Sequence, residues 1–204
     1  MKTVLLTSRS IKKNDEIYFS LDKNWFNYLL NTKITIIPNL PSKMNVYLEE
    51  PSYSGIVLAG GGNIRKNSLS NNDFDDEREI VEEHLIEYSI ANNIPLIGVC
   101  RGMQKIMTVL EKKIEFVDNK IEIKDSYELS NAIKSEVTFK GTRTCYNNFS
   151  ILYDKNIENS WNVLCLDSNK NILAVIHKKF KILSFMWHPE RDMSDFELVN
   201  SFLN

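Results

Sequence analysis

The stretch Ile94-Pro95-Leu96-Ile97-Gly98-Val99-Cys100-Arg101-Gly102 decides the predicted fold. An apolar run leads into Cys100, and a glycine stands two residues to either side of it. A residue at a sharp strand-to-helix turn needs such small neighbours, because the backbone there is strained and closely packed. The pattern therefore predicts a buried strand over residues 95–99, a helix from residue 101 to about residue 112, and Cys100 at the turn between them.

The position of Cys100 indicates a nucleophile. The positive end of the following helix favours the thiolate, which is the reactive form of cysteine. The alternative is a packing residue, because a free cysteine usually behaves as a small buried hydrophobe. The glycine frame around Cys100 favours the nucleophile, whereas Cys145 and Cys165 lack such a frame and are predicted to be packing residues.

A second motif, Trp187-His188-Pro189-Glu190, follows an apolar run near the end of the sequence. His188 should emerge at the end of a strand, where the loops of a sheet gather. Pro189 stiffens the turn, and Glu190 can accept the imidazole N–H and fix its tautomer. The alternative is that His188 has only a structural role at the end of the strand. Together with Cys100, the pair of His188 and Glu190 favours the catalytic role and predicts a cysteine hydrolase.

The glycine run Gly60-Gly61-Gly62-Asn63 has two possible roles. It could be a phosphate loop, but neither the Gly-Lys-Ser/Thr ending nor the spacing of a dinucleotide fingerprint is present. It could instead point bare backbone N–H groups at an oxyanion, as acyl transfer requires. We favour the oxyanion hypothesis, with the N–H of Arg101 as the other donor.

Strands and helices alternate along the first half of the chain. Apolar runs predict strands over residues 4–7, 34–37, 55–59 and 95–99, with helices beginning at Asp22 and at Asp75 or Asp76. The second half looks antiparallel, with short strands predicted over residues 136–139, 161–167, 171–177 and 181–187 and a closing helix over 194–203. We expect one α/β domain over residues 1–204, with a mostly parallel, doubly wound sheet, helices on both faces and antiparallel additions in the C-terminal half.

The spacing of apolar residues assigns a buried side to each helix. His84 falls on such a side, and neither it nor His177 has a partner that would indicate catalysis. The expected core residues are Trp25, Phe26, Leu29 and Leu30 in the first helix, Ile80, Val81, His84, Leu85, Tyr88 and Ala91 in the second, Met103, Ile106, Met107 and Leu110 in the third, and Phe196, Val199, Phe202 and Leu203 in the last.

Composition narrows the class of protein further. The 204 residues are 43% hydrophobic and 25% charged, with a net charge of -2, which gives no electrostatic reason to expect nucleic-acid binding. No apolar run approaches the roughly 20 residues that span a bilayer. The apolar run at the N-terminus is too short for a signal peptide, because polar residues follow it closely. Three widely spaced cysteines form neither a disulfide framework nor a zinc pattern, so we expect a cytoplasmic protein without a metal site.

These motifs resemble the class I glutamine amidotransferase-like family, whose pattern Gly-x-Cys-x-Gly-x-Gln is completed here by Gln104. The resemblance covers most of the chain, from the first strand to the His-Pro-Glu motif. It implies Cys100 as nucleophile, His188 as base and Glu190 as the residue that orients the base. It also implies Gln104 beside a bound glutamyl group, an oxyanion hole formed by the N–H of Arg101 with that of Gly60 or Gly61, and no metal or organic cofactor.

Two details resemble the γ-glutamyl hydrolase branch. One is the arginine after the cysteine, and the other is the segment Arg78-Glu79-Ile80-Val81-Glu82, close to an Arg-Asp-x-x-Glu pattern of that branch. Each has a simpler alternative: Arg101 could cover a helix end, and Arg78 and Glu82 could be a solvated i,i+4 pair.

The loop that contains Asn147 and Asn148 differs from the Asn-Ser-x-His that relatives often carry, because the histidine is missing. We nevertheless expect these two asparagines to contact the substrate. Four basic residues could contact a phosphate on the substrate: Arg9, Arg65, Lys66 and Arg143.

The resemblance implies hydrolysis of a γ-glutamyl amide or phosphoramidate of a small molecule through a γ-glutamyl thioester. The narrowest substrate it implies is γ-glutamyl-CDP-amidate, in the modification of capsular polysaccharide. The alternatives are a glutaminase subunit that delivers ammonia to a separate synthetase, and a relative without catalytic activity. The sequence does not decide the oligomeric state.

Overall fold

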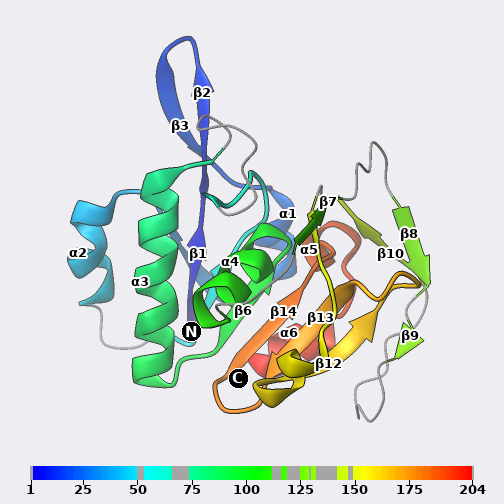
Figure 1. The fold of residues 1–204 in the computed structure, drawn as a ribbon. Coiled ribbons are helices and arrows are strands. Elements are labelled where there is room, and N and C mark those ends of the chain that lie inside the picture. The colour runs from blue at the N-terminus through cyan, green and yellow to red at the C-terminus, as the bar shows by residue number, and fades with distance from the viewer. Residues whose placement is uncertain are drawn as a thin grey trace.

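The computed structural model describes residues 2–49, 53–65, 74–111, 116–118, 125–128, 130–131, 142–146 and 149–203. Its centre is an eight-stranded sheet (Figure 1). In spatial order the strands are β4 (Thr32–Ile37), β1 (Lys2–Thr7), β5 (Gly55–Leu58), β6 (Leu96–Val99), β14 (Ile182–Phe185), β13 (Ile172–His177), β12 (Trp161–Leu166) and β9 (Ser130–Asn131).

The first five strands of this order are parallel, and the last three are antiparallel additions from the C-terminal half. Strands β5 and β6 are buried along their whole length. Continuous burial is typical of central parallel strands that are covered on both faces. The predicted mixed sheet is therefore confirmed.

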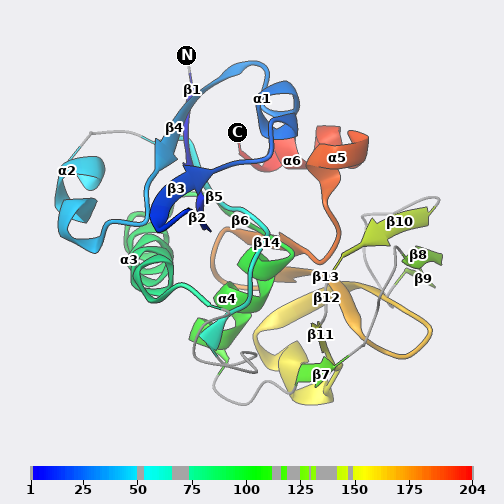
Figure 2. The same cartoon turned by 90° about the horizontal axis from the view of Figure 1, so that it is seen from above.

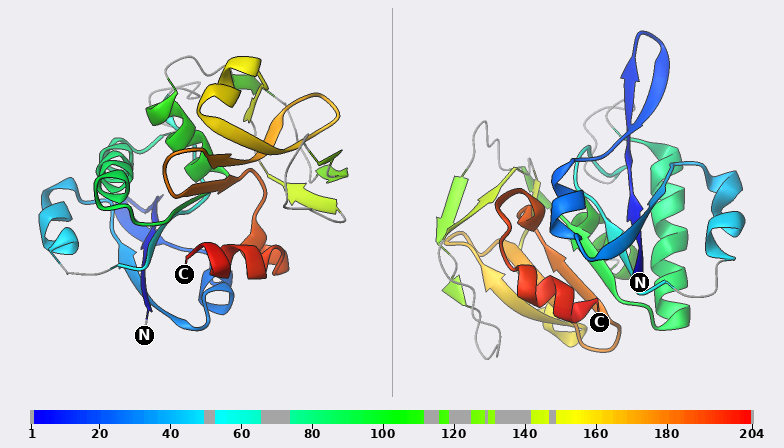
Figure 3. Two further views of the ribbon diagram at one scale, coloured as in Figure 1. Left: turned by 90° about the horizontal axis from the view of Figure 1, so that it is seen from below. Right: turned by 180° about the vertical axis from the view of Figure 1, so that it is seen from behind.

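Helices cover both faces of the sheet, as expected (Figures 2 and 3). The long helix α3 (Asp76–Asn92) and helix α4 (Arg101–Leu110) lie on one face. Helices α1 (Asn24–Tyr28) and α6 (Phe196–Phe202) lie on the other. The short elements η1 (Pro41–Lys43) and α2 (Met44–Leu48) lie beside α3. Helix α5 (Pro189–Asp192) follows strand β14 in the chain.

The buried side predicted for the first helix is wrong in part. Phe26 and Leu30 are 48% and 72% exposed, whereas Tyr28, which was not expected in the core, is fully buried. The reason is a contact with α6, because the Tyr28 ring lies edge-on to that of Phe196 at 5.7 Å and its hydroxyl donates to the carbonyl of Ser194. Apolar spacing within so short a helix does not predict this docking.

The buried side predicted for the long helix α3 is also wrong in part. Ile80, His84 and Ala91 are exposed, although Val81 and Leu85 are buried as expected. Charged residues occupy much of the buried side instead: Arg78, Glu79 and Glu82. Hydrophobic periodicity cannot predict such an arrangement, since it assigns charged residues to solvent.

Strands β2 (Arg9–Lys13) and β3 (Glu16–Ser20) form a hairpin that the sequence analysis did not predict. It projects beyond the carboxyl end of β1 (Figure 1). Asn14 and Asp15 form its two-residue turn with φ values of 50° and 64°. Asparagine and aspartate are favoured in such turns because they tolerate positive φ, so this pair was the available sequence signal.

The remaining strands form small ladders beside the sheet. Strand β8 (Asp125–Glu128) pairs with β10 (Thr142–Cys145), and β7 (Phe116–Asp118) pairs with β11 (Phe149–Ile151), which precedes η3 (Lys155–Asn159). The strand predicted over residues 136–139 lies outside the described residues. No helix in the described part of the chain has both the length and the apolar character needed to cross a bilayer.

Candidate active site

Cys100 lies at the predicted turn between β6 and α4. Its backbone has φ 53° and ψ −108°, a strained conformation for a residue with a side chain. Its N–H donates to the carbonyl of Phe185 at 2.7 Å, which fixes the turn against the neighbouring strand. A Cβ at Gly102 would overlap the carbonyl oxygen of Leu58. The close packing that was expected to require a small residue at this position is thus present.

His188 and Glu190 meet Cys100 at the same edge of the sheet. Nδ1 of His188 lies 2.7 Å from Oε1 of Glu190, and the side chains of His188 and Cys100 line one cavity and both lie against Gly60. All three side chains are buried, with exposed fractions of 7% for Cys100, 5% for His188 and 2% for Glu190. The structure therefore brings the three predicted catalytic residues together in one row.

The electrostatics of this row favour a charged thiolate. Burial raises the pKa of the Cys100 thiol, but the charge of His188, its hydrogen bond and the backbone N–H of Arg101 together lower that pKa below 9.0. Burial lowers the pKa of His188, yet Cys100 and Glu190 outweigh it and raise that pKa to about 9. A thiolate beside an imidazolium is the reactive form of a cysteine nucleophile.

The glycine loop after β5 lies against the same row. A Cβ on Gly60 would lie 2.5 Å from Cε1 of His188 and 3.3 Å from Cβ of Cys100. Gly61 has φ 90°, which favours glycine. The N–H of Ala59 donates to Oγ1 of Thr7 at 3.0 Å, which anchors the start of the loop. Placed this close to the thiol, the loop fits the oxyanion hypothesis better than the phosphate-loop hypothesis.

Arg78 and Glu82 form the i,i+4 pair of the simpler alternative, but the pair is buried and not solvated, and Arg101 is buried beside it. Arg78 is 2% exposed and donates from Nε to Glu82 Oε1 at 2.7 Å. Arg101 is 1% exposed and forms ion pairs with Glu82 and with Glu79, the latter at 2.6 Å. The two arginines outweigh burial and lower the pKa of Glu82. The ion pairs of Arg101 join α3 to α4, the helix that begins directly after the nucleophile.

A cavity of about 330 Å³ opens over Cys100 and is also lined by Gln104 and His188. Nε2 of Gln104 donates to the carbonyl of Phe149 at 2.9 Å. Gln104 thus lines the same cavity as Cys100, and its contact with a glutamyl group stays a prediction. Asn147 and Asn148 lie outside the described residues.

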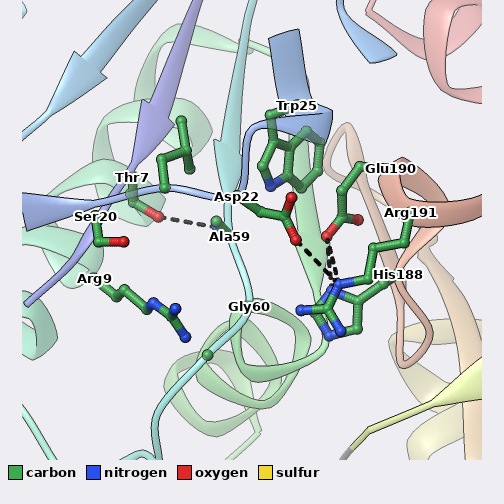
Figure 4. A pocket seen from close by; sticks show the side chains of 12 residues that line it. Thr7, Arg9, Ser20, Asp22, Trp25, Ala59, Gly60, His188, Glu190 and Arg191 are labelled. Atoms are coloured by element: carbon green, nitrogen blue, oxygen red, sulfur yellow. Dashed lines mark hydrogen bonds and ion pairs between the residues drawn. The ribbon is translucent and has the colours of Figure 1, made fainter. Parts of the chain in front are cut away.

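A smaller cavity of about 150 Å³ adjoins this one and is shown in Figure 4. Arg9 lies on one side of it, and Glu190, Arg191 and Asp22 lie on the other. Nε of Arg191 is 3.2 Å from Oδ2 of Asp22. Among the described residues no ion pair is formed by Arg9, whose side chain lies over Gly61 beside both cavities.

Two of the other predicted phosphate contacts, Arg65 and Arg143, line neither cavity. Arg65 forms an exposed ion pair with Asp76, and Arg143 forms a mostly buried ion pair with Asp195 at 2.9 Å. Lys66 lies outside the described residues. Only Arg9 of the predicted set is therefore placed by the structure beside the nucleophile.

The remaining cysteines line neither of the two cavities. Cys145 and Cys165 are buried free thiols, and burial raises the pKa of Cys165 to about 12. Both fit the predicted packing role. In the part of the chain that the structure describes, no three His, Cys, Asp or Glu side chains are grouped so that they could hold a metal ion.

Comparisons with known proteins identify the family of the chain. The model of the family "Glutamine amidotransferase class-I" matches residues 16–203. The gamma-glutamyl-CDP-amidate hydrolase of Campylobacter jejuni is 29% identical over 137 residues, which cover 67% of this chain and 62% of that protein. The chain thus spans less than two thirds of the length of this relative.

Solved structures share the fold at low sequence identity. The glutaminase domain of Trypanosoma brucei CTPS, with bound acivicin, superposes with a TM-score of 0.67 at 13% identity, over 100% of this chain and 92% of that one. A glutamine amidotransferase of Thermotoga maritima gives 0.60 at 15% identity, over 100% and 90%. The fold and family expected from the sequence are confirmed, and the chain belongs to the class-I glutamine amidotransferase family.

Proposed function

We propose that this protein is a cysteine hydrolase that cleaves the γ-glutamyl amide or phosphoramidate bond of a small molecule. The row of Cys100, His188 and Glu190, in which His188 contacts Glu190 and shares a cavity with Cys100, supports this proposal. The acceptor Glu190 lies 2.7 Å from Nδ1 of His188, which leaves the other ring nitrogen for the thiol. A nucleophile, a base and a group that orients the base are what covalent acyl transfer requires.

In the first half of the proposed reaction the Cys100 thiolate attacks the γ-carbonyl carbon. Negative charge then develops on the carbonyl oxygen, and the N–H groups of Arg101 and of Gly60 or Gly61 stabilise it. The C–N bond breaks as His188 gives its proton to the leaving nitrogen. The products of this half are the free amine or amidate and a γ-glutamyl thioester on Cys100.

In the second half a water molecule attacks the thioester. His188, now neutral, accepts a proton from the water, and the C–S bond breaks. Glutamate leaves, and the thiolate beside a protonated His188 is restored. Burial of the row supports both halves, because charges interact more strongly where water is excluded.

For the substrate we propose a γ-glutamyl group joined to a phosphate-bearing leaving group, with γ-glutamyl-CDP-amidate as the narrowest candidate. The name of the Campylobacter relative supports this choice. Arg9 supports it independently, since it is a cation beside both cavities without an ion-pair partner among the described residues. Arginine matches the geometry of phosphate oxygens.

A glutaminase subunit would use the same three residues, so the triad alone does not separate the two functions. The test is a mass-spectrometric panel of γ-glutamyl compounds, including glutamine and nucleotide-linked amidates, with Cys100→Ala as the control. We expect the isolated wild-type chain to release glutamate from the nucleotide-linked compound and to act poorly on glutamine. Glutaminase activity that appears only with a stoichiometric partner would favour the ammonia-delivering subunit instead.

A further inference from the structure

The buried guanidinium of Arg78 holds the glycine loop from behind. Nη2 donates to the carbonyl of Ala59 at 2.5 Å and, at the longer distance of 3.5 Å, to that of Gly60. Nη1 donates to the carbonyl of Gly61 at 2.8 Å. Three consecutive carbonyl groups therefore point toward one side chain on α3.

The direction of these carbonyl groups determines where the N–H groups of the loop point. In a trans peptide the carbonyl of one residue and the N–H of the next point in opposite directions. Because the carbonyl groups of Ala59 and Gly60 face Arg78, the N–H groups of Gly60 and Gly61 face away from it. A Cβ built on Gly60 would lie only 3.3 Å from Cβ of Cys100, so the loop lies close to the nucleophile.

The orientation of Arg78 is itself fixed by a carboxylate. Nε of Arg78 donates to Oε1 of Glu82, whose other oxygen accepts from Arg101. Arg101 directly follows Cys100 in the sequence and supplies the second predicted oxyanion donor. A single buried carboxylate therefore joins the side chains that lie behind both halves of the predicted oxyanion hole.

We propose that Arg78 is a positioning residue that aims the N–H groups of the glycine loop at the oxyanion. This inference rests on the proposed function, because it assigns Arg78 a role in the same acyl transfer. Arginine suits the role because its planar fork reaches several oxygens at once, whereas lysine offers a single point charge. Arg78 would thus act on the transition state without touching the substrate.

The same ion-pair network offers a matched control. Lys105 is 2% exposed and pairs with Glu79 at 2.8 Å and with Glu83 at 2.6 Å. Within the described part of the chain, the ion pairs and hydrogen bonds of Lys105 do not reach the glycine loop. Lys105→Gln therefore disturbs the buried charges without removing a hydrogen bond to the loop.

The experiment compares Arg78→Lys, Arg78→Gln and Lys105→Gln with the wild-type protein. Loss of one oxyanion donor costs about 10²–10³ in kcat, so a misaimed donor should cost about 10- to 100-fold. We expect that loss in both Arg78 variants with KM within about threefold, and little change in Lys105→Gln. A γ-aldehyde analogue of glutamate, which forms a tetrahedral adduct with the thiol, should bind the Arg78 variants more weakly by a similar factor.

Alkylation of Cys100 by iodoacetamide separates this role from a structural one. It needs the thiolate but no oxyanion hole, so its rate should stay unchanged in folded Arg78 variants. Where Arg78 variants fail to fold, Thr7→Val removes the anchor of the loop without changing a charge, and a smaller loss of kcat with unchanged alkylation is expected. Wild-type kcat and aldehyde affinity in Arg78→Lys, or an equal loss in Lys105→Gln, would overturn the inference. An inactive wild-type chain would instead overturn the proposed function.

Discussion

Nδ1 of His188 lies 2.7 Å from Oε1 of Glu190, and neither side chain is more than 5% exposed. The second carboxylate oxygen of Glu190 has no hydrogen-bond partner among the described residues. The contact with Oε1 and the edge-on ring of Tyr146, at 5.6 Å, position the imidazole. The contact with Glu190 fixes which ring nitrogen faces Cys100, and the reactivity of the thiol depends on it.

Replacing Glu190 with Gln should lower kcat by about 10²–10⁴-fold while the fold is retained, because the amide keeps the shape of the carboxylate but not its charge. Steady-state kinetics and a thermal melt measure the two effects. Glu197→Gln, at an exposed position of α6, is the matched control and should retain activity. A fully active Glu190→Gln enzyme would show that the carboxylate does not orient the base.

The pH dependence of the reaction should reflect both shifted groups. The pKa of Cys100 lies below 9.0, so the thiolate forms as the pH rises through that lowered value. The pKa of His188 is about 9, so the proton for the leaving nitrogen is lost above that pH. We expect kcat/KM to rise with the first ionisation and to fall above about pH 9.

Alkylation by iodoacetamide checks the thiolate without turnover. Cys100 should react at a lower pH than an ordinary thiol, because its pKa is lowered, whereas Cys165, with a pKa of about 12, should stay unreactive in the folded protein. Peptide mass spectrometry assigns the site of reaction. A Cys100 rate that rises only in the range of an unperturbed thiol would contradict the ion pair.

Arg9→Gln should lower kcat/KM for a nucleotide-linked γ-glutamyl amidate by about tenfold or more, the order of magnitude of one charged hydrogen bond. Its effect on a γ-glutamyl anilide should be small, because the aniline leaving group is uncharged and carries no phosphate. The ratio of the two constants is the measurement. Lys13→Gln, on the same hairpin but away from both cavities, is the control. Equal losses on both substrates would argue against a phosphate contact at Arg9.

Gly102→Ala should destabilise the protein, because its Cβ would overlap the backbone of Leu58 and neither backbone segment can move freely. Overpacking of this kind costs about 1–3 kcal/mol. Urea denaturation measures the free energy of unfolding, and Ser201→Ala at an exposed helical position is the comparison. Unchanged stability in Gly102→Ala would mean that the turn is not closely packed.

The sequence predicted the sheet and the row of three residues because those features are encoded locally. The glycine frame of Cys100 and the short spacing from His188 to Glu190 need no knowledge of distant contacts. The i,i+4 spacing of Arg78 and Glu82 is visible in the sequence, but the burial of this pair could not be predicted from it. The ion pairs of Arg101 depend on the packing of α3 against α4, which periodicity describes only through apolar residues.

The docking of Tyr28 on Phe196 and the position of Arg9 are also products of tertiary structure. The first joins residues from opposite ends of the chain. The position of Arg9 depends on the β2–β3 hairpin. Both strands of this hairpin are mostly exposed, so its sequence has no pattern of alternating buried residues from which it could be predicted. The turn residues Asn14 and Asp15 were its only local signal, and such a pair is common in loops of many kinds.

The most direct test of the account is the mass of the intact protein after mixing with a γ-glutamyl substrate and rapid quenching in acid. We predict an adduct of one glutamyl group on Cys100 in the wild-type protein and its absence in Cys100→Ala. Hydrolysis of the substrate by Cys100→Ala, or hydrolysis by the wild type with a glutamyl adduct on a different residue, would contradict the proposed thioester.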